Sequence, residues 1–289
     1  MKNKLSWFAV PYVVWMALFV VAPIILVVIY AFSTADGSFT LDNFSRMGTY
    51  AVVFGRSFKL AIIATAVCLL IGYPISYLMS REGPRFQRVG MILIMLPMWM
   101  NFLLRTYSWM SILENNGLLN RLFQSIGLID LYNQIAMSLS ANPAAYEPIT
   151  HFQLINTQGA VVLGMVYNYL PFMILPIYNT LIKLDPSLLN ASDDLGASPW
   201  QTFTRVTLPL SKPAILSGIN MVFMPSVTTF VISRLLGGSS TALIGDIIEK
   251  QFKLVDDKGF GSAMSVIIMI FVFGLVALTR EKDSEEVSL

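Results

Sequence analysis

Six long apolar stretches, each free of aspartate and glutamate, dominate this sequence. Each is close to the roughly 20 residues that a helix needs to cross the hydrocarbon core of a bilayer. Because lipid offers the backbone no hydrogen-bond partner, such stretches fold as transmembrane helices. We therefore expect an all-α integral membrane protein with one transmembrane domain, residues 1–289. Its six predicted spans are residues 7–32, 58–79, 91–113, 160–182, 213–232 and 262–279.

The charge content excludes several classes of protein. Only 12% of the residues are charged, whereas soluble domains carry about 25%. The net charge of +2 is too small to indicate nucleic-acid binding. The single cysteine, Cys68, cannot form an internal disulfide, and the single histidine, His151, has no neighbouring metal ligand in the sequence. Since the sequence also lacks a Gly-x4-Gly-Lys phosphate loop, we expect no catalytic residue, metal site or cofactor.

Basic residues near the ends of the spans indicate which side of the membrane each loop faces. Lys2 and Lys4 precede the first span, and the short loop 80–90 carries three arginines and one glutamate. Cytoplasmic loops are enriched in Lys and Arg, so we expect both termini, this loop and residues 183–212 in the cytoplasm. The first apolar run exceeds the about 7–15 residues of a signal-peptide core, which favours a retained span over a cleaved leader.

The longest predicted outer loop, residues 114–159, begins with an amphipathic stretch. Apolar residues recur on one helical face within residues 116–131. A helix of this kind lies in the membrane interface, with its apolar face toward the lipid, rather than crossing the bilayer. Asn-Pro and Glu-Pro pairs follow it and predict an irregular loop.

Between the fourth and fifth spans lies a polar segment with several helix-end signals. Asp185-Pro186 predicts a helix start, because aspartate caps the first amides and proline needs no partner at the first position. Gly196 can adopt the left-handed conformation that ends a helix. Ser198-Pro199 repeats the start signal, and Leu208-Pro209 predicts the end of the second helix. The segment therefore predicts two short helices at an angle, and a projecting amphipathic helix fits a groove of another protein.

The spacing within this segment matches a known signature. From Asn190 it runs N-A-S-x3-G-A-x8-V-x-L-P, which resembles the EAA signature, E-A-A-x3-G-x9-I-x-L-P, of permeases of binding-protein-dependent ABC importers. The resemblance implies a MetI-like permease in which residues 186–209, the coupling segment, dock into a cleft of the ATPase subunit. The coupling residues that it implies are Asn190, Ala191, Ser192, Asp193, Asp194, Gly196, Ala197, Leu208 and Pro209. The family usually has glutamate in place of Asn190 and alanine in place of Ser192.

Three longer stretches narrow the resemblance. Residues 96–120, 163–198 and 230–252 look like the first permease subunit of spermidine/putrescine importers, the PotB type. This implies a polyamine permease in the bacterial cytoplasmic membrane. The implied partners are a second permease subunit (PotC type), an ATPase dimer (PotA type) that binds ATP and Mg²⁺, and an extracellular polyamine-binding protein (PotD type). Two alternatives stay open: a permease for another small solute, such as iron or thiamine, and a non-transporting membrane sensor.

Aromatic residues are the candidates for a cation path. A buried carboxylate is costly when it is unpaired, whereas an aromatic face attracts an ammonium group by about 0.5–2 kcal/mol and can release it. The third and fourth spans supply the candidate path residues Trp99, Asn101, Tyr107, Tyr167 and Tyr169. The competing interpretation is that these side chains belt the lipid interface or pack helices together. Arg105, inside the third span, would repel a polyamine, so we expect it to hold helices together or to contact the partner subunit.

Overall fold

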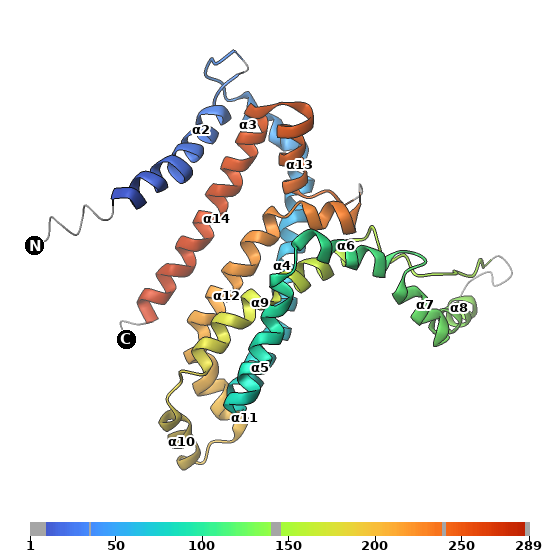
Figure 1. Cartoon of the computed structure of the whole chain (residues 1–289), viewed down its shortest axis with the longest axis vertical. Coiled ribbons are helices and arrows are strands. Elements are labelled where there is room, and N and C mark those ends of the chain that lie inside the picture. Colours follow the sequence, from blue (N-terminus) through green and yellow to red (C-terminus); the bar gives the residue numbers. More distant parts are fainter. Residues whose placement is uncertain (1–9, 35, 140–145, 239–240, 287–289) are drawn as a thin grey trace, which may run out of the picture. The chain divides into compact units, whose positions relative to one another are not determined.

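The structure is a computed structural model that describes residues 10–34, 36–139, 146–238 and 241–286, with side chains as far as residue 277 (Figure 1). Among the described residues the regular elements are helices, with one isolated bridge between Ser33 and Phe39. Five helices are long and apolar enough to cross a membrane, or six if one bent pair counts as a single span. The expected all-helical membrane architecture is therefore confirmed.

The chain divides into two compact units, one made of Met1–Gly55 with Gly245–Leu289 and the other of Arg56–Ile244. In the first unit the long helix Val10–Ala31, which ends as α2 (Ala22–Ala31), packs along α14 (Lys258–Glu286). The short elements of this unit are η1 (Ala17–Val21), α3 (Asp42–Ser45), η2 (Arg46–Tyr50) and η8 (Gln251–Val255), and α13 (Ile244–Lys250) starts at the boundary.

The core of the second unit is formed by α4 (Ala51–Arg81), which begins in the first unit, with α9 (Gln158–Leu181) and α12 (Leu208–Thr228). Glycines let these helices approach closely at Met173, which is fully buried. A Cβ at Gly72 would lie 3.0 Å from the Met173 side chain, and one at Gly218 would lie 2.8 Å from its sulfur. Small residues at such contacts are typical of membrane helices, because packing drives their association.

The third predicted span is not one straight helix. Residues 91–113 fall on α5 (Pro84–Met95), the 3-10 turn η3 (Leu96–Trp99) and α6 (Phe102–Leu113). The helical stretches before and after the break are bent by 92°. Hydropathy detects the length of an apolar run but not a turn within it, which is why the sequence predicts a single span here.

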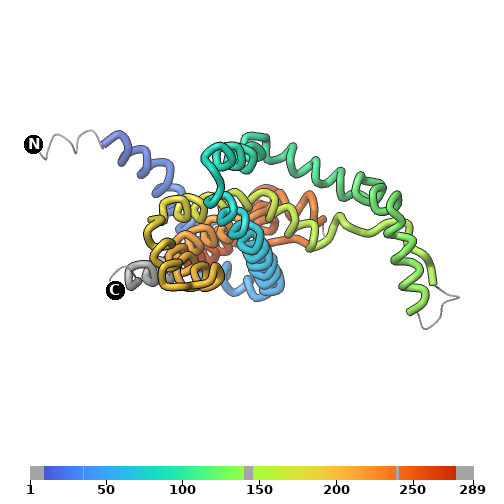
Figure 2. Tube along the Cα trace, turned by 90° about the horizontal axis from the view of Figure 1, so that it is seen from below, coloured from blue at the N-terminus to red at the C-terminus, as the bar shows by residue number. Residues whose placement is uncertain are grey.

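The predicted outer loop contains two further helices, α7 (Leu118–Ser125) and α8 (Leu128–Leu139), which extend away from α6 (Figure 2). The apolar face expected on residues 116–131 is present, since Leu118 is 71% and Ile126 is 63% exposed. Two asparagines hold the returning chain: the side-chain amide of Asn120 bonds both the N–H and the C=O of Phe152, and that of Asn133 does the same at Ile149.

The fourth predicted span agrees closely with α9, but the fifth does not begin where the sequence indicates. The expectation that Leu208-Pro209 ends a helix is wrong, because one helical run extends over Pro199–Thr228. A π turn, η5 (Phe203–Thr207), stands directly before this proline. Proline loses the bond to residue i−4 and its ring collides with that carbonyl, and the wider π turn accommodates both effects. The helix α12 ends at Thr228, and the chain continues to η6 (Ser233–Gly237).

Candidate functional site

The first arm of the coupling segment is α10 (Pro186–Asp194), which begins as the sequence predicts. The carboxylate of Asp185 accepts a hydrogen bond of 2.9 Å from the amide of Ser187. This backbone bond lowers the pKa of Asp185 below its usual value, so the cap is ionised at neutral pH. A negative charge at this end is also favoured by the helix dipole.

The first arm ends at Gly196, also as predicted. Its φ is +73°, a left-handed conformation that costs other residues energy. The amide of Gly196 donates to the Asp193 carbonyl and that of Ala197 donates to the Ser192 carbonyl. These two bonds form a Schellman motif, which satisfies carbonyls at the end of the helix. No atom lies within 4 Å of the place where a Cβ would be, so the requirement for glycine comes from the backbone alone.

The second arm is α11 (Pro199–Thr202), and it begins with a reciprocal cap. The amide of Gln201 donates to the Ser198 hydroxyl, and the amide of Ser198 donates to the Gln201 side chain. This capping box fixes the direction in which the second arm leaves the turn. Because the arm continues through η5 into α12, its orientation is tied directly to a long helix of the unit.

One buried hydrogen bond joins the two arms. The hydroxyls of Ser192 and Thr202 lie 2.7 Å apart, and both residues are less than a tenth exposed. The serine that departs from the family signature therefore has a structural partner. Thr202 is a residue that the sequence did not single out, because only the folded segment brings positions 192 and 202 together.

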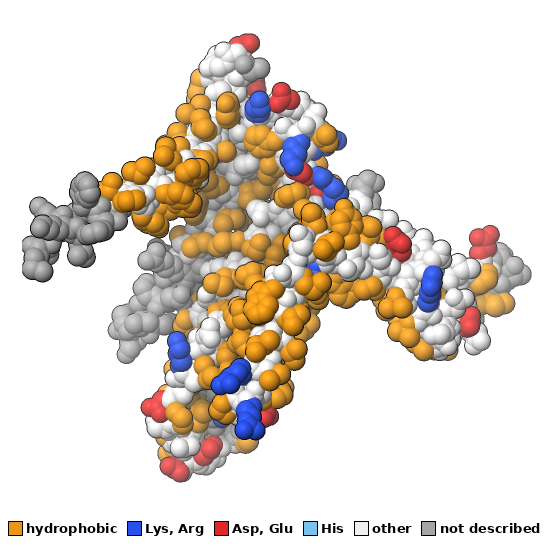
Figure 3. Space-filling view, in the orientation of Figure 1, with side chains coloured by type: hydrophobic (Ala, Val, Ile, Leu, Met, Phe, Trp, Pro, Cys, Tyr) orange, Lys and Arg blue, Asp and Glu red, His pale blue; other side chains and the backbone are white. Residues whose placement is uncertain are grey.

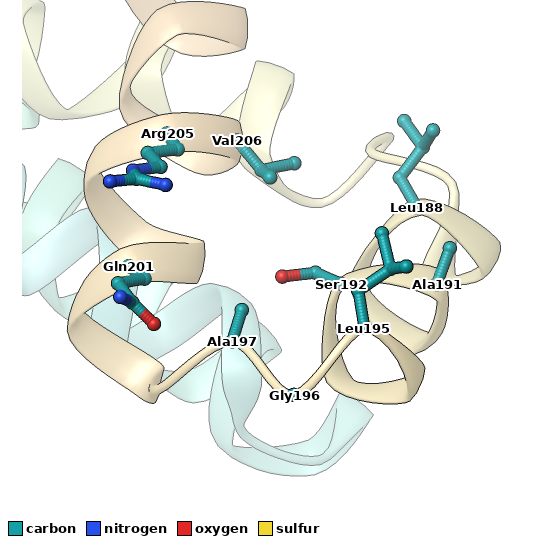
Figure 4. A pocket seen from close by; sticks show the side chains of 9 residues that line it. All are labelled: Leu188, Ala191, Ser192, Leu195, Gly196, Ala197, Gln201, Arg205 and Val206. Carbon is teal, nitrogen blue, oxygen red and sulfur yellow. The ribbon is translucent and has the colours of Figure 1, made fainter.

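The arms enclose a hollow of about 510 Å³ (Figure 4). Ser192 on one arm and Val206 on the other point into this space. The lining residues are Leu188, Ala191, Ser192, Leu195, Gly196, Ala197, Gln201, Arg205 and Val206. The lining is mainly apolar with one cationic side chain, a composition suited to contact with another protein.

The predicted coupling residues occupy different environments. Asn190, Ala191, Asp193, Asp194 and Gly196 are exposed on the first arm. Ala197, Leu208 and Pro209 are half-buried, and Leu208 packs against the core of the unit rather than facing outward. Two large apolar side chains that the sequence did not single out are more prominent: Leu195 is 88% and Trp200 is 70% exposed.

Two of the three candidate path residues on the third predicted span lie at its bend. Trp99 is the last residue of η3 and is 77% exposed. Asn101 caps α6, its side-chain oxygen accepting hydrogen bonds from the amides of Leu103 and Leu104. Tyr107, on α6, is 46% exposed. The outer face of these helices is covered by hydrophobic side chains, and basic side chains gather near the start of α5 (Figure 3).

The candidate residues on the fourth span are engaged inside the unit. Trp109 meets the ring of Tyr167 edge-on with centroids 5.3 Å apart, and the Arg105 guanidinium lies 5.8 Å from the same ring. Tyr169 donates a long hydrogen bond of 3.5 Å to the Pro225 carbonyl. The structure thus brings Tyr167 and Tyr169 into helix packing and leaves Trp99 and Tyr107 with open faces. In the described part of the chain no cluster of three or more His, Cys, Asp or Glu could hold a metal ion.

Comparison with known proteins gives a consistent set of similarities. Residues 72–280 match the family model described as "Binding-protein-dependent transport system inner membrane component". The chain is 37% identical over 273 residues to the spermidine/putrescine transport system permease protein PotB of Haemophilus influenzae, covering 90% of this chain and 89% of that protein.

Solved structures share the fold. A chain of a crystallised bacterial alginate ABC transporter superposes with a TM-score of 0.72 at 16% identity, over 96% of this chain and 93% of that one. A chain of the MetNI methionine ABC transporter gives a TM-score of 0.53 at 15% identity, over 82% and 95% of the two chains. At these identities the superpositions establish the MetI-like fold alone.

Proposed function

This chain belongs to the family of inner membrane components of binding-protein-dependent transport systems, and we propose that it imports polyamines of the spermidine and putrescine class. As a member of that family it is a multi-pass permease subunit of an ABC importer, a complex that also contains an ATPase and a binding protein. The subunit lacks ATPase activity of its own and needs no cofactor.

The observation that supports the polyamine assignment is the extent of the similarity to PotB, which covers nearly the whole chain rather than the signature alone. The chemistry of the spans is compatible with it. A polyamine carries several ammonium groups, which aromatic faces attract and release. Trp99 presents such a face at the bend between η3 and α6, and Tyr107 presents another within α6. Trp99, Asn101 and Tyr107 are therefore our candidate contacts along the path.

For the partners we propose those of the PotB relatives' type: a second permease subunit like PotC, an ATPase dimer like PotA and an external binding protein like PotD. The coupling segment is the proposed docking site for the ATPase. Its exposed Leu195 and Trp200 supply apolar area, and the adjacent Asp193 and Asp194 supply the negative charge that Asn190 lacks. Interfaces commonly place large apolar anchors inside a polar rim.

For the orientation we propose that the coupling segment and both termini face the cytoplasm. The arginine-rich loop between α4 and α5 supports this arrangement, because short cytoplasmic loops are enriched in basic residues.

The test of the cargo is uptake by cells that lack other polyamine importers and express this subunit with its proposed partners. We expect accumulation of radiolabelled spermidine or putrescine that stops when the ATPase carries an inactivating substitution. Thiamine and ferric iron serve as matched alternative solutes in the same cells. Uptake of either solute without uptake of any polyamine would contradict the assignment while leaving the permease family intact.

A further inference from the structure

The bend after η3 leaves backbone groups without helical partners. Within a bilayer such groups are costly, because neither lipid nor a broken helix satisfies them. Met100 adopts an extended conformation between η3 and α6, so the carbonyls at the end of η3 cannot continue into helix bonds. Asn101 supplies acceptors for the first amides of α6. On the η3 side the carbonyl of Pro97 accepts one bond, 3.2 Å long, from the Met100 amide, and a carbonyl oxygen can accept from a second donor.

Arg105 supplies that donor. Its Nη1 lies 2.7 Å from the carbonyl oxygen of Pro97, across the bend, and the residue is only 8% exposed. Arg105 follows Asn101 by four residues, and its amide donates to the Asn101 carbonyl, so the two residues lie one helical turn apart at the start of α6. Together they close the bend from both sides: Asn101 holds the α6 amides and Arg105 holds the η3 carbonyl.

The same guanidinium also reaches α9. Its Cζ lies 5.8 Å from the ring of Tyr167 and 6.0 Å from that of Phe102, within the range of a cation–π contact. In the described part of the chain no ion pair joins Arg105 to a carboxylate, and its Nε has no hydrogen-bond partner. A backbone carbonyl and two ring faces therefore hold this buried charge.

We infer that Arg105 is a positioning residue that locks the bend between η3 and α6, directs Trp99 outward, and occupies the Tyr167 ring, which leaves Trp99 rather than Tyr167 open to a cation. The effect of Arg105 on transport rests on the proposed polyamine function, whereas its role in holding the bend does not. A substrate ammonium approaching Tyr167 would meet the like charge of Arg105, which disfavours that ring as a contact. Trp99 is 77% exposed. Arg88 lines the same hollow as Trp99, but in the described part of the chain no guanidinium lies over the Trp99 ring.

The structural part is tested by thiol labelling in the purified complex, in a Cys68→Ala background. A cysteine is introduced by Trp99→Cys, or by Leu93→Cys as a control on α5 before the bend, where the side chain is 63% exposed, and its rate of reaction with N-ethylmaleimide is measured. Arg105→Met keeps the length of the side chain but removes the donors. We expect it to change the rate at position 99 by about ten-fold, the scale of a lost charged hydrogen bond, and to leave position 93 unchanged. Arg105→Lys, which can still donate to the Pro97 carbonyl, should restore most of the original rate.

Two labelling results would overturn the inference. An unchanged rate at position 99 in the Arg105→Met protein shows that the bend holds without the arginine. Equal changes at positions 99 and 93 show a general loosening of α5 rather than a local lock. Copurification with the ATPase subunit verifies that each variant still assembles.

The transport part is tested by a double-mutant cycle of Trp99→Ala and Arg105→Met, measured as the apparent affinity for spermidine. If Arg105 acts through Trp99, the arginine substitution should have little further effect once the tryptophan is gone. Additive losses contradict action through Trp99. Normal uptake by Trp99→Ala alone refutes the aromatic path of the proposed function, and the labelling experiment then still decides the structural role of Arg105.

Discussion

The hydroxyl groups of Ser192 and Thr202 lie 2.7 Å apart and are buried between the two arms of the coupling segment. The turn between the arms is otherwise held by backbone bonds and end caps. The angle between α10 and α11 therefore depends on one pair of short side chains that lie ten positions apart.

Thr202→Val tests this pair. Valine has the shape of threonine without the hydroxyl, so Ser192 is left buried and unpaired, at a cost of about 1–3 kcal/mol. We expect weaker copurification of the ATPase and slower uptake. The double variant Ser192→Ala/Thr202→Val removes both polar groups and should recover most of the lost activity, because no unpaired group remains. A double variant as impaired as the single one would contradict this account.

The left-handed backbone of Gly196 leads to a separate prediction about substitutions at this position. Because its φ is +73° and the surrounding space is open, only conformational strain opposes a side chain, at roughly 1–2 kcal/mol for an ordinary residue. Gly196→Val should uncouple ATP hydrolysis from transport or release the ATPase, while the spans insert normally. Gly196→Asn is the matched control, since asparagine tolerates the left-handed conformation. Equal behaviour of the two variants would show that side-chain volume, not φ, matters.

The exposed face of Trp99 predicts a change in substrate affinity. Trp99→Ala removes a cation–π contact of about 0.5–2 kcal/mol, so the apparent affinity for a polyamine should fall by about 2- to 30-fold. Trp99→Tyr keeps an aromatic face and should lose less. The measurement is the concentration dependence of uptake, and a change in maximal rate with unaltered affinity would speak for a packing role.

The basic residues of the loops predict that the coupling segment faces the cytoplasm, and cysteine labelling tests this orientation. In a Cys68→Ala background, Ser198→Cys should be protected from a membrane-impermeant maleimide in spheroplasts and should react in inside-out vesicles. Ser125→Cys, on the exposed surface of α7, is the control and should show the opposite pattern. Reaction of position 198 from outside would reverse the topology.

The first unit contains a pH-dependent ion pair, in which Arg46 lies 2.8 Å from Asp257. Partial burial of the Asp257 carboxyl raises its pKa, but the Phe260 amide and Arg46 outweigh this, so the pKa lies below the usual 3.8. A carboxyl with a depressed native pKa stabilises the fold above its unfolded pKa, and this contribution is lost as the pH falls through the native value.

The consequence is measurable as thermal unfolding of Asp257→Asn against the unaltered chain. The difference should be about 0.5 kcal/mol at pH 6, because the pair is partly exposed. It should shrink as the pH falls below about 3.8 and vanish below the lower native pKa. Asp36→Asn is the matched control, with the same change of charge at an exposed residue of the same unit. A difference that persists unchanged at acid pH would exclude the ion pair as its source.

Local signals in the sequence predict local structure well. The caps at Asp185 and Ser198 and the left-handed Gly196 follow from short-range chemistry, and the structure contains all three. The family signature can likewise be recognised from the spacing of residues along the chain. These features depend on residues within one or two helical turns of each other, so neighbours far along the chain do not alter them.

Where predictions from the sequence fail, the local structure depends on distant contacts or on a compensating turn. Pro209 predicts a helix end, yet the helical run continues past it because a π turn precedes it. The bend at Trp99 lies inside a continuous apolar run, where Pro97 and the Asn101 cap hint at it but do not define its angle. The Ser192–Thr202 bond and the engagement of Tyr167 by Arg105 require the folded arrangement.

The uninterrupted helix from Pro199 to Thr228 has the properties of a lever. Its 30 residues span about 45 Å at 1.5 Å per residue. Gly218 rests against Met173, which places a fulcrum about two-thirds of the way along. If the helix pivots there, a displacement of the coupling end arrives at the far end reversed in direction and reduced to about half. That far end carries Pro225, whose carbonyl holds the hydroxyl of Tyr169.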